Sequence, residues 1–247
     1  MTIGRWVTVG GAALLLFLAG PAAAQDLSLN LGQGGGSTTA RVIQLLAVLT
    51  IISLAPSILV MVTSFTRIVV VLSFLRTALG VQQTPPNTVI TSLALFLTAF
   101  IMAPVLEQVY QEAFLPLLNE QISEGEALQR AIAPVQGFML RHTREQDLNL
   151  FVGIAKLDPQ ITPEETPVHV LIPAFMISEL RRAFEIGFLL FIPFLIIDMV
   201  VATVLMSMGM MMLPPATISL PFKIIFFVLV DGWYLVVGSL VQSFGQL

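Results

Sequence analysis

Three ionisable side chains interrupt long apolar runs of this 247-residue sequence: Asp198, Lys223 and Asp231. A charge at membrane depth is costly, so such residues usually serve a function. Asp198 and Lys223 each lie eight residues from the intervening stretch 206–215. At 1.5 Å per helical residue, both would lie about 12 Å from it. We predict an ion pair between them, within one chain or between chains, while a proton relay through Asp198 and Asp231 stays open as the alternative.

Motifs of the common enzyme classes are absent from the sequence. It contains no zinc-protease, P-loop, serine-hydrolase or dinucleotide-binding pattern. It has no cysteine, and its two histidines, His142 and His169, are too few to favour a zinc site. We interpret both histidines as surface or capping residues. The sequence therefore predicts no catalytic residue, no bound metal and no cofactor.

A methionine-rich stretch follows Asp198. It holds five of the 11 methionines, namely Met206, Met208, Met210, Met211 and Met212, and it ends at Pro214 and Pro215. Gly209 and the two prolines favour a turn over a helix. Methionine is unbranched and adapts to irregular shapes. Several such turns around an axis would form a gasket that closes a channel to ions yet yields to a passing polypeptide. Ordinary packing at the end of a membrane span is the alternative.

The composition indicates an integral membrane protein. Hydrophobic residues make up 56% of the chain and charged residues 11%, whereas soluble domains carry roughly 25% charged residues. The formal net charge of −4 and the absence of a basic run argue against a nucleic-acid partner.

Four apolar runs are long enough, or nearly so, to cross a bilayer, and no alternating β-barrel pattern occurs, so we expect helices. The runs are residues 42–65, 89–106, 186–206 and 218–240. Pro56, Pro104 and Pro193 lie inside them and predict kinks. Arg67 and Arg76 fall in the expected turn between the first two runs, which would be cytoplasmic, as would the turn near Lys223.

The N-terminus is typical of a secretory signal peptide over residues 1–24. Arg5 precedes an apolar stretch, and small residues before Gln25 predict cleavage between Ala24 and Gln25. An uncleaved first anchor is the alternative. We divide the rest into a flexible periplasmic linker at 25–41, a first hydrophobic helical hairpin at 42–106, a helical periplasmic segment at 107–185 and a second hairpin with the Met-rich turn at 186–247.

Around and within the segment 107–185, apolar residues recur at helical spacing in three stretches, from Val105 to Gln121, from Ala127 to Met139 and from Leu148 to Ala155. Thr162 and Glu165 have a capping-box spacing with Pro163 at the first helical position, so we expect a short helix there. Residues 174–188 are predicted to run as a helix directly into the third apolar run.

Two long stretches, 173–188 and 221–233, resemble the signatures of the FliP family, the flagellar biosynthetic proteins of the type III export gate, whose virulence-secretion relatives are called SctR. The residues that carry this resemblance are Pro173, Phe175, Glu179, Phe184, Gly187, Pro221, Asp231, Gly232 and Trp233. Ser64 to Ile68, Leu75 with Arg76, and Asp198 with the Met-rich turn are similar to the same family. The resemblance extends from about residue 42 to residue 233, and the signal peptide is more similar to the flagellar branch.

The resemblance implies an all-α membrane protein of kinked helical hairpins that assembles as a ring, with five copies joining FliQ and FliR around a channel. It further implies FlhB and FlhA as partners and unfolded flagellar subunits as the cargo that crosses the bacterial inner membrane. In that ring Met210, Met211 and Met212 would form the gasket, Asp198 and Lys223 would pair, and much of the ring would lie toward the periplasm in the flagellar basal body. The alternatives are a virulence-secretion homologue, a proton-relay transporter or channel subunit, and a scaffold for FliQ and FliR without a pore.

Overall fold

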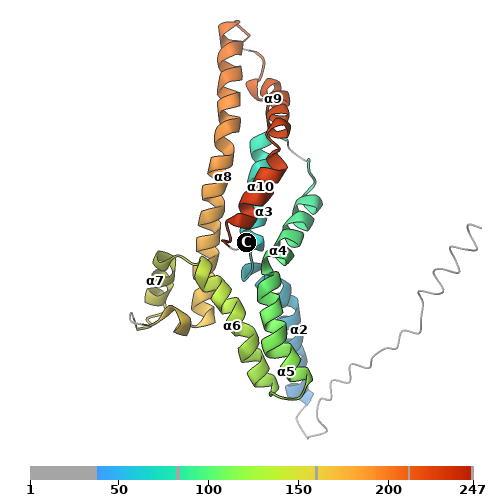
Figure 1. The fold of residues 1–247 in the computed structure, drawn as a ribbon, viewed down its shortest axis with the longest axis vertical. Coiled ribbons are helices and arrows are strands. Elements are labelled where there is room, and N and C mark those ends of the chain that lie inside the picture. The colour runs from blue at the N-terminus through green and yellow to red at the C-terminus, as the bar shows by residue number, and fades with distance from the viewer. Residues whose placement is uncertain (1–37, 82–83, 159–160, 211, 246–247) are drawn as a thin grey trace, which may run out of the picture. The chain divides into compact units, whose positions relative to one another are not determined.

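The computed structural model describes residues 38–81, 84–158, 161–210 and 212–245, and every regular element in these ranges is a helix (Figure 1). The predicted cleavage point between Ala24 and Gln25 lies outside the described residues, as does Met211. Contacts divide the chain into two units after Ser53. The first unit contributes the start of α2 (Thr38–Met61) to the described residues, and all later elements belong to the second.

The core of the second unit forms between α3 (Phe65–Leu79) and α8 (Val168–Ser207), which pack along each other (Figure 1). α3 ends at Gly80, whose φ of 78° suits glycine and whose N–H donates to the Thr77 carbonyl. The buried apolar side chains that join the two helices are Ile68, Val71, Leu72 and Leu75 of α3 and Leu171, Ala174, Phe175 and Ala183 of α8. Burial of this apolar surface is the main stabilising contribution to the helix pair.

Between these two helices the chain makes an excursion of several further helices. They are α4 (Asn87–Val109), the π-helical turn η1 (Tyr110–Phe114), α5 (Leu115–Leu118), α6 (Glu124–His142), α7 (Glu145–Ile154) and the 3₁₀ turn η2 (Pro163–Glu165). The side chain of Ser123 caps α6 by accepting from the Glu126 N–H. η2 is the short helical element that the sequence predicts after Thr162, although the Thr162 side chain makes no capping bond.

The C-terminal part consists of α9 (Pro215–Leu229) and α10 (Gly232–Gln242). The two helices meet at an angle of 63°, and Asp231 at the break has a φ of 51°. The fourth apolar run is therefore a bent helix pair, with Asp231 at its corner.

In the part of the chain that the structure describes, two helical segments are long and apolar enough to span a membrane, Asn87–Leu118 and Val168–Ser207. The pairs α2–α3 and α9–α10 raise the number of candidate spans to four if each bent pair counts as one. The expected continuation of residues 174–188 into the third apolar run is confirmed, because α8 is one helix of 40 residues.

The expected turn that carries Arg67 and Arg76 is wrong. Both residues lie in α3, and the break between α2 and α3 comes earlier, at residues 62–64. The physical reason is that Glu179 neutralises the Arg67 guanidinium inside the protein, while Arg76 in the last turn of α3 donates to the Asn87 side chain, so neither residue needs a loop exposed to water. The positive charge of Arg67 is therefore no indicator of a cytoplasmic loop.

Candidate functional site

The first polar cluster joins α8 to α9 around Lys223. Its Nζ lies 2.6 Å from Asp198 Oδ2 and donates to the Ala78 carbonyl at 3.3 Å. The Ser219 hydroxyl donates to the other carboxylate oxygen of Asp198 at 2.5 Å. The Lys223 side chain is 8% exposed and that of Asp198 40% exposed, so the ammonium group is buried while its counter-ion reaches the surface. Both residues belong to one chain, the first of the two arrangements that the sequence left open.

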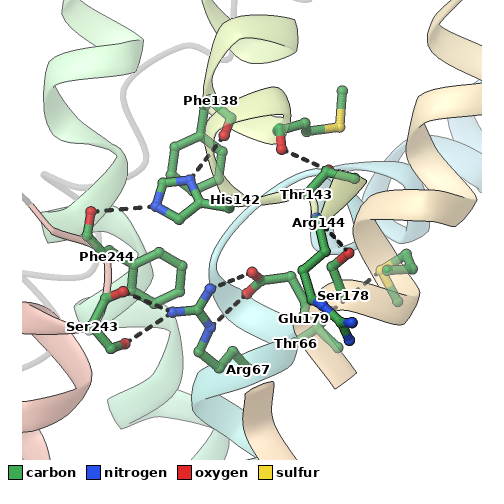
Figure 2. A network of polar contacts seen from close by, with 12 residues as sticks. Thr66, Arg67, Phe138, His142, Thr143, Arg144, Ser178, Glu179, Ser243 and Phe244 are labelled. Atoms are coloured by element: carbon green, nitrogen blue, oxygen red, sulfur yellow. Dashed lines mark hydrogen bonds and ion pairs between the residues drawn. The ribbon is translucent and has the colours of Figure 1, made fainter. Parts of the chain in front are cut away.

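The second cluster surrounds Arg67 on α3 (Figure 2). Its guanidinium makes a two-pronged contact with the Glu179 carboxylate on α8, with Nε 2.9 Å from Oε2 and Nη2 bonded to Oε1. Neither side chain has exposed surface. Bidentate pairing of this kind satisfies both charges in a fixed geometry. This buried ion pair therefore joins α3 to α8 within the core.

The same guanidinium also holds the end of the chain. Arg67 Nη1 donates to the Ser243 carbonyl at 3.1 Å and to its hydroxyl at 2.9 Å, and the guanidinium carbon lies 3.7 Å from the centre of the Phe244 ring. Figure 2 shows His142 on the other side of this segment, with Nε2 3.3 Å from the Phe244 carbonyl. The segment after α10 is thus bound to both α3 and α6.

His142 contradicts the interpretation of a surface or capping histidine in a loop. It lies in the last turn of α6, is buried, and packs against the rings of Phe138 and Phe244. His169 is exposed at the start of α8. The burial of His142 depends on Phe244, which lies 102 residues further along the chain, so no local pattern reveals it.

A third contact ties α7 to α8 through Ser178. Its hydroxyl donates to Asp147 at 2.7 Å and accepts from the Arg144 N–H at 3.0 Å, as Figure 2 shows for Arg144. Ser178 directly precedes Glu179, so this contact and the Arg67 cluster share one turn of α8.

The Met-rich stretch forms the connection between α8 and α9. α8 ends at Ser207, Gly209 has a φ of 75°, and α9 begins at Pro215. The exposed fractions of the methionines are 57% for Met206, 66% for Met208, 41% for Met210 and 98% for Met212. These side chains have little packing within the chain itself.

The remaining signature residues fall into two groups. Phe175, Glu179, Gly187 and Gly232 are buried against other helices, and Pro173 and Pro221 lie inside α8 and α9. Phe184, Asp231 and Trp233 are exposed, and Phe184 packs edge to face on Phe74 with ring centres 5.0 Å apart. Within the described ranges no group of three metal-binding side chains gathers at one place.

These features define an all-helical membrane protein whose helices are joined by ion pairs, of which that between Arg67 and Glu179 is fully buried. A model of the FliP family matches residues 48–240. A flagellar biosynthetic protein FliP of Caulobacter vibrioides is 63% identical over 91% of this chain and 85% of its own length. The FliP protein of Bacillus subtilis is 59% identical over 82% of this chain and 91% of its own length. The FliP protein of Pectobacterium carotovorum is 56% identical over 93% of this chain and 90% of its own length. The chain belongs to the FliP family. As a member it is a non-enzymatic component of the flagellar export apparatus.

Proposed function

We propose that this chain is a pore-forming core subunit of the flagellar type III protein-export gate in the bacterial inner membrane. Copies of the chain, five in the ring that the family resemblance implies, surround a channel with FliQ and FliR and work with FlhB and FlhA. Unfolded flagellar subunits pass through this channel. The Met-rich turns close it when no substrate is present.

The observation that carries this proposal is the exposed Met-rich turn in a chain of the FliP family. Met212 is 98% exposed and Met208 66%, at the tip of a hairpin whose other side chains are mostly apolar. Large apolar side chains that a single chain leaves unburied are usually covered by a partner. Flexible thioether side chains that meet around an axis would exclude water and ions and still deform around a polypeptide.

A proton relay through Asp198 and Asp231 receives less support. Asp198 is engaged by Lys223 and Ser219. Asp231 lies eight residues beyond Lys223, which is about 12 Å along a helix, and the side chains between them on α9 are all apolar. Protons would need titratable groups or water between the two carboxylates.

The test is ion conductance through membranes that contain the assembled gate. Alanine at Met210, Met211 and Met212 together should raise conductance, because a soft plug becomes a set of gaps. Leucine at the same positions keeps the apolar bulk and should leave the membrane nearly tight while impairing passage of substrate. Met61→Ala removes an exposed methionine of α2, outside both the turn and the apolar surface of α8, and should change neither.

Unchanged conductance in the triple alanine variant would contradict the gasket. Full secretion and no leak in every methionine variant would favour a scaffold for FliQ and FliR that contributes nothing to closing the pore.

A further inference from the structure

A cavity of about 310 Å³ opens where α4, α6 and the end of the chain meet. At roughly 30 Å³ per water molecule, it has room for about ten water-sized groups. Its walls are formed by Phe100, Ile101, Pro104, Val105 and Gln108 of α4, by Phe138, Arg141 and His142 of α6, and by Val241 and Phe244. None of these ten residues is acidic, so the cavity has an apolar lining with basic and amide groups at its polar side.

The polar groups of the cavity differ in what they already bind. Both ring nitrogens of His142 face backbone carbonyls, Nδ1 that of Phe138 at 2.9 Å and Nε2 that of Phe244 at 3.3 Å, as Figure 2 shows. Arg141, in contrast, has no hydrogen bond or ion pair with any residue that the structure describes, and it lies beside Gly137 one turn earlier. Its donors and the Gln108 amide are therefore available to a ligand, and a guanidinium prefers an anion.

The apolar side of the cavity continues onto a surface of α4. The helix carries no charged residue from Asn87 to Leu106, and Glu107 is the first. Gln108 thus lies just beyond the apolar run, whereas Phe100 and Ile101 lie within it. Phe96 and Phe100 are one turn apart and are 76% and 61% exposed, so an apolar track leads away from the cavity. A ligand that matches both ends has an anionic group and a hydrocarbon chain.

We propose that this cavity binds an anionic phospholipid. The phosphate accepts hydrogen bonds from Arg141 and Gln108, and the first part of an acyl chain packs against Phe100 and Ile101. Membrane lipid is the source that the position on a candidate membrane-spanning helix favours. This site is independent of the Met-rich turn and of the Asp198–Lys223 pair.

The experiment is native mass spectrometry of the full-length protein in detergent micelles, titrated with phosphatidylglycerol or with phosphatidylcholine of the same acyl chains. We expect the wild type to prefer phosphatidylglycerol by at least about tenfold, the size typical of a charge-assisted contact. Arg141→Gln should remove the preference, and Arg141→Lys should keep part of it. Arg130→Gln is the matched control, because Arg130 lies on the same helix but pairs with Glu126 at the surface.

A second variant keeps the test valid if Arg141→Gln misfolds. Gln108 is exposed, so Gln108→Leu should preserve the fold and the unfolding temperature while weakening the preference for phosphatidylglycerol. Equal binding of the two lipids by the wild type would overturn the proposal, as would an undiminished preference in Arg141→Gln. Complete displacement of lipid by millimolar inorganic phosphate would show a simple anion site instead. Loss of oligomer mass in Arg141→Gln without any lipid preference in the wild type would show a contact between protein chains.

Discussion

Arg67 and Glu179 are charged groups without exposed side-chain surface, so each depends on the other for the polar contacts that water would otherwise supply. Removing one partner leaves an uncompensated buried charge, which costs about 3–5 kcal/mol. We expect Glu179→Ala or Arg67→Ala to lower the unfolding temperature sharply or to abolish recovery of folded protein. Thermal unfolding in detergent measures this effect.

The control for this prediction replaces both charges together. Arg67→Met with Glu179→Leu should recover much of the loss, because an apolar pair leaves no charge stranded. Arg181→Gln tests an exposed pair with Glu185, and a pair of that kind contributes only about 0–1 kcal/mol. A double variant as unstable as either single variant would mean that the contacts of Arg67 with Ser243 and Phe244 matter more than the pair itself.

Asp198 and Lys223 should respond unequally to mutation, because only the lysine is buried. Asp198→Ala leaves the Lys223 ammonium with the Ala78 carbonyl as its partner, whereas Lys223→Ala leaves Asp198 with Ser219 and solvent. We expect Asp198→Ala to reduce folded yield and assembly more than Lys223→Ala does. Membrane yield and complex size after detergent extraction measure the difference.

The charge swap, Asp198→Lys with Lys223→Asp, is the companion experiment. It should restore only part of the assembly lost in either alanine variant, because a carboxylate at position 223 would face the Ala78 carbonyl, which can only accept hydrogen bonds. Equal losses in both single variants, with full recovery in the swap, would contradict the argument from burial.

The sequence predicts the ion pair between Asp198 and Lys223 but not the polar cluster around Arg67. Helical rise alone puts Asp198 and Lys223 at one depth on two neighbouring helices. Arg67 and Glu179 are 112 residues apart, and only the packing of α3 on α8 brings them together. A signal was nevertheless present, since Arg67 stands in an apolar run and Glu179 in the family signature. A charged side chain in apolar surroundings usually pairs with an opposite charge.

At the scale of helices, the contact between α3 and α8 depends on the absence of a side chain at Gly187. A Cβ there would come 2.5 Å from Cδ2 of Phe74, whose ring packs against Phe184 and Phe191. Overpacking of this kind costs about 1–3 kcal/mol. We expect Gly187→Ala to lower the unfolding temperature.

Gly238→Ala is the matched control for this prediction. Gly238 lies inside α10, and a Cβ there would meet nothing within 4 Å. Alanine favours a helix over glycine by up to about 1 kcal/mol, so this variant should be neutral or stabilising. Equal behaviour of the two variants would show that Phe74 moves aside freely and that the close contact has no energetic weight.

Most helices follow from apolar periodicity, and the exceptions have physical causes. α6, α7 and α8 coincide with stretches of helical spacing. The sequence does not predict α3, because Arg67 and Arg76 are typical of a loop, whereas in the structure Arg67 pairs with Glu179 and Arg76 donates to Asn87. The break between α9 and α10 falls at Asp231, which the sequence marks as a charge in an apolar run but not as a residue of positive φ, and the π-helical turn Tyr110–Phe114 lies beyond the second apolar run, where helical spacing continues and does not indicate a change of helix type.

At the scale of the whole molecule, the second unit leaves a large apolar surface on α8. Phe188, Leu189 and Met199 are each more than 60% exposed, although they lie in the most apolar part of the helix. Lipid or other chains must cover such a surface in the cell. The Met-rich turn lies at one end of the same helix. In a single chain its methionines surround no axis and cannot close a channel. The proposed gasket therefore requires that several chains surround an axis.

Native mass spectrometry of the detergent-extracted protein decides this point, first with the chain alone and then with FliQ and FliR co-expressed. We expect a discrete homo-oligomer that gains the mass of both partners, with five copies of this chain in the complete assembly. The subunit mass will also show whether residues 1–24 have been removed. An assembly of another copy number would keep the channel and change the size of the pore that the methionines must fill. A monomer or dimer under both conditions would leave no axis for a channel, and the exposed surface of α8 would then be a surface for lipid.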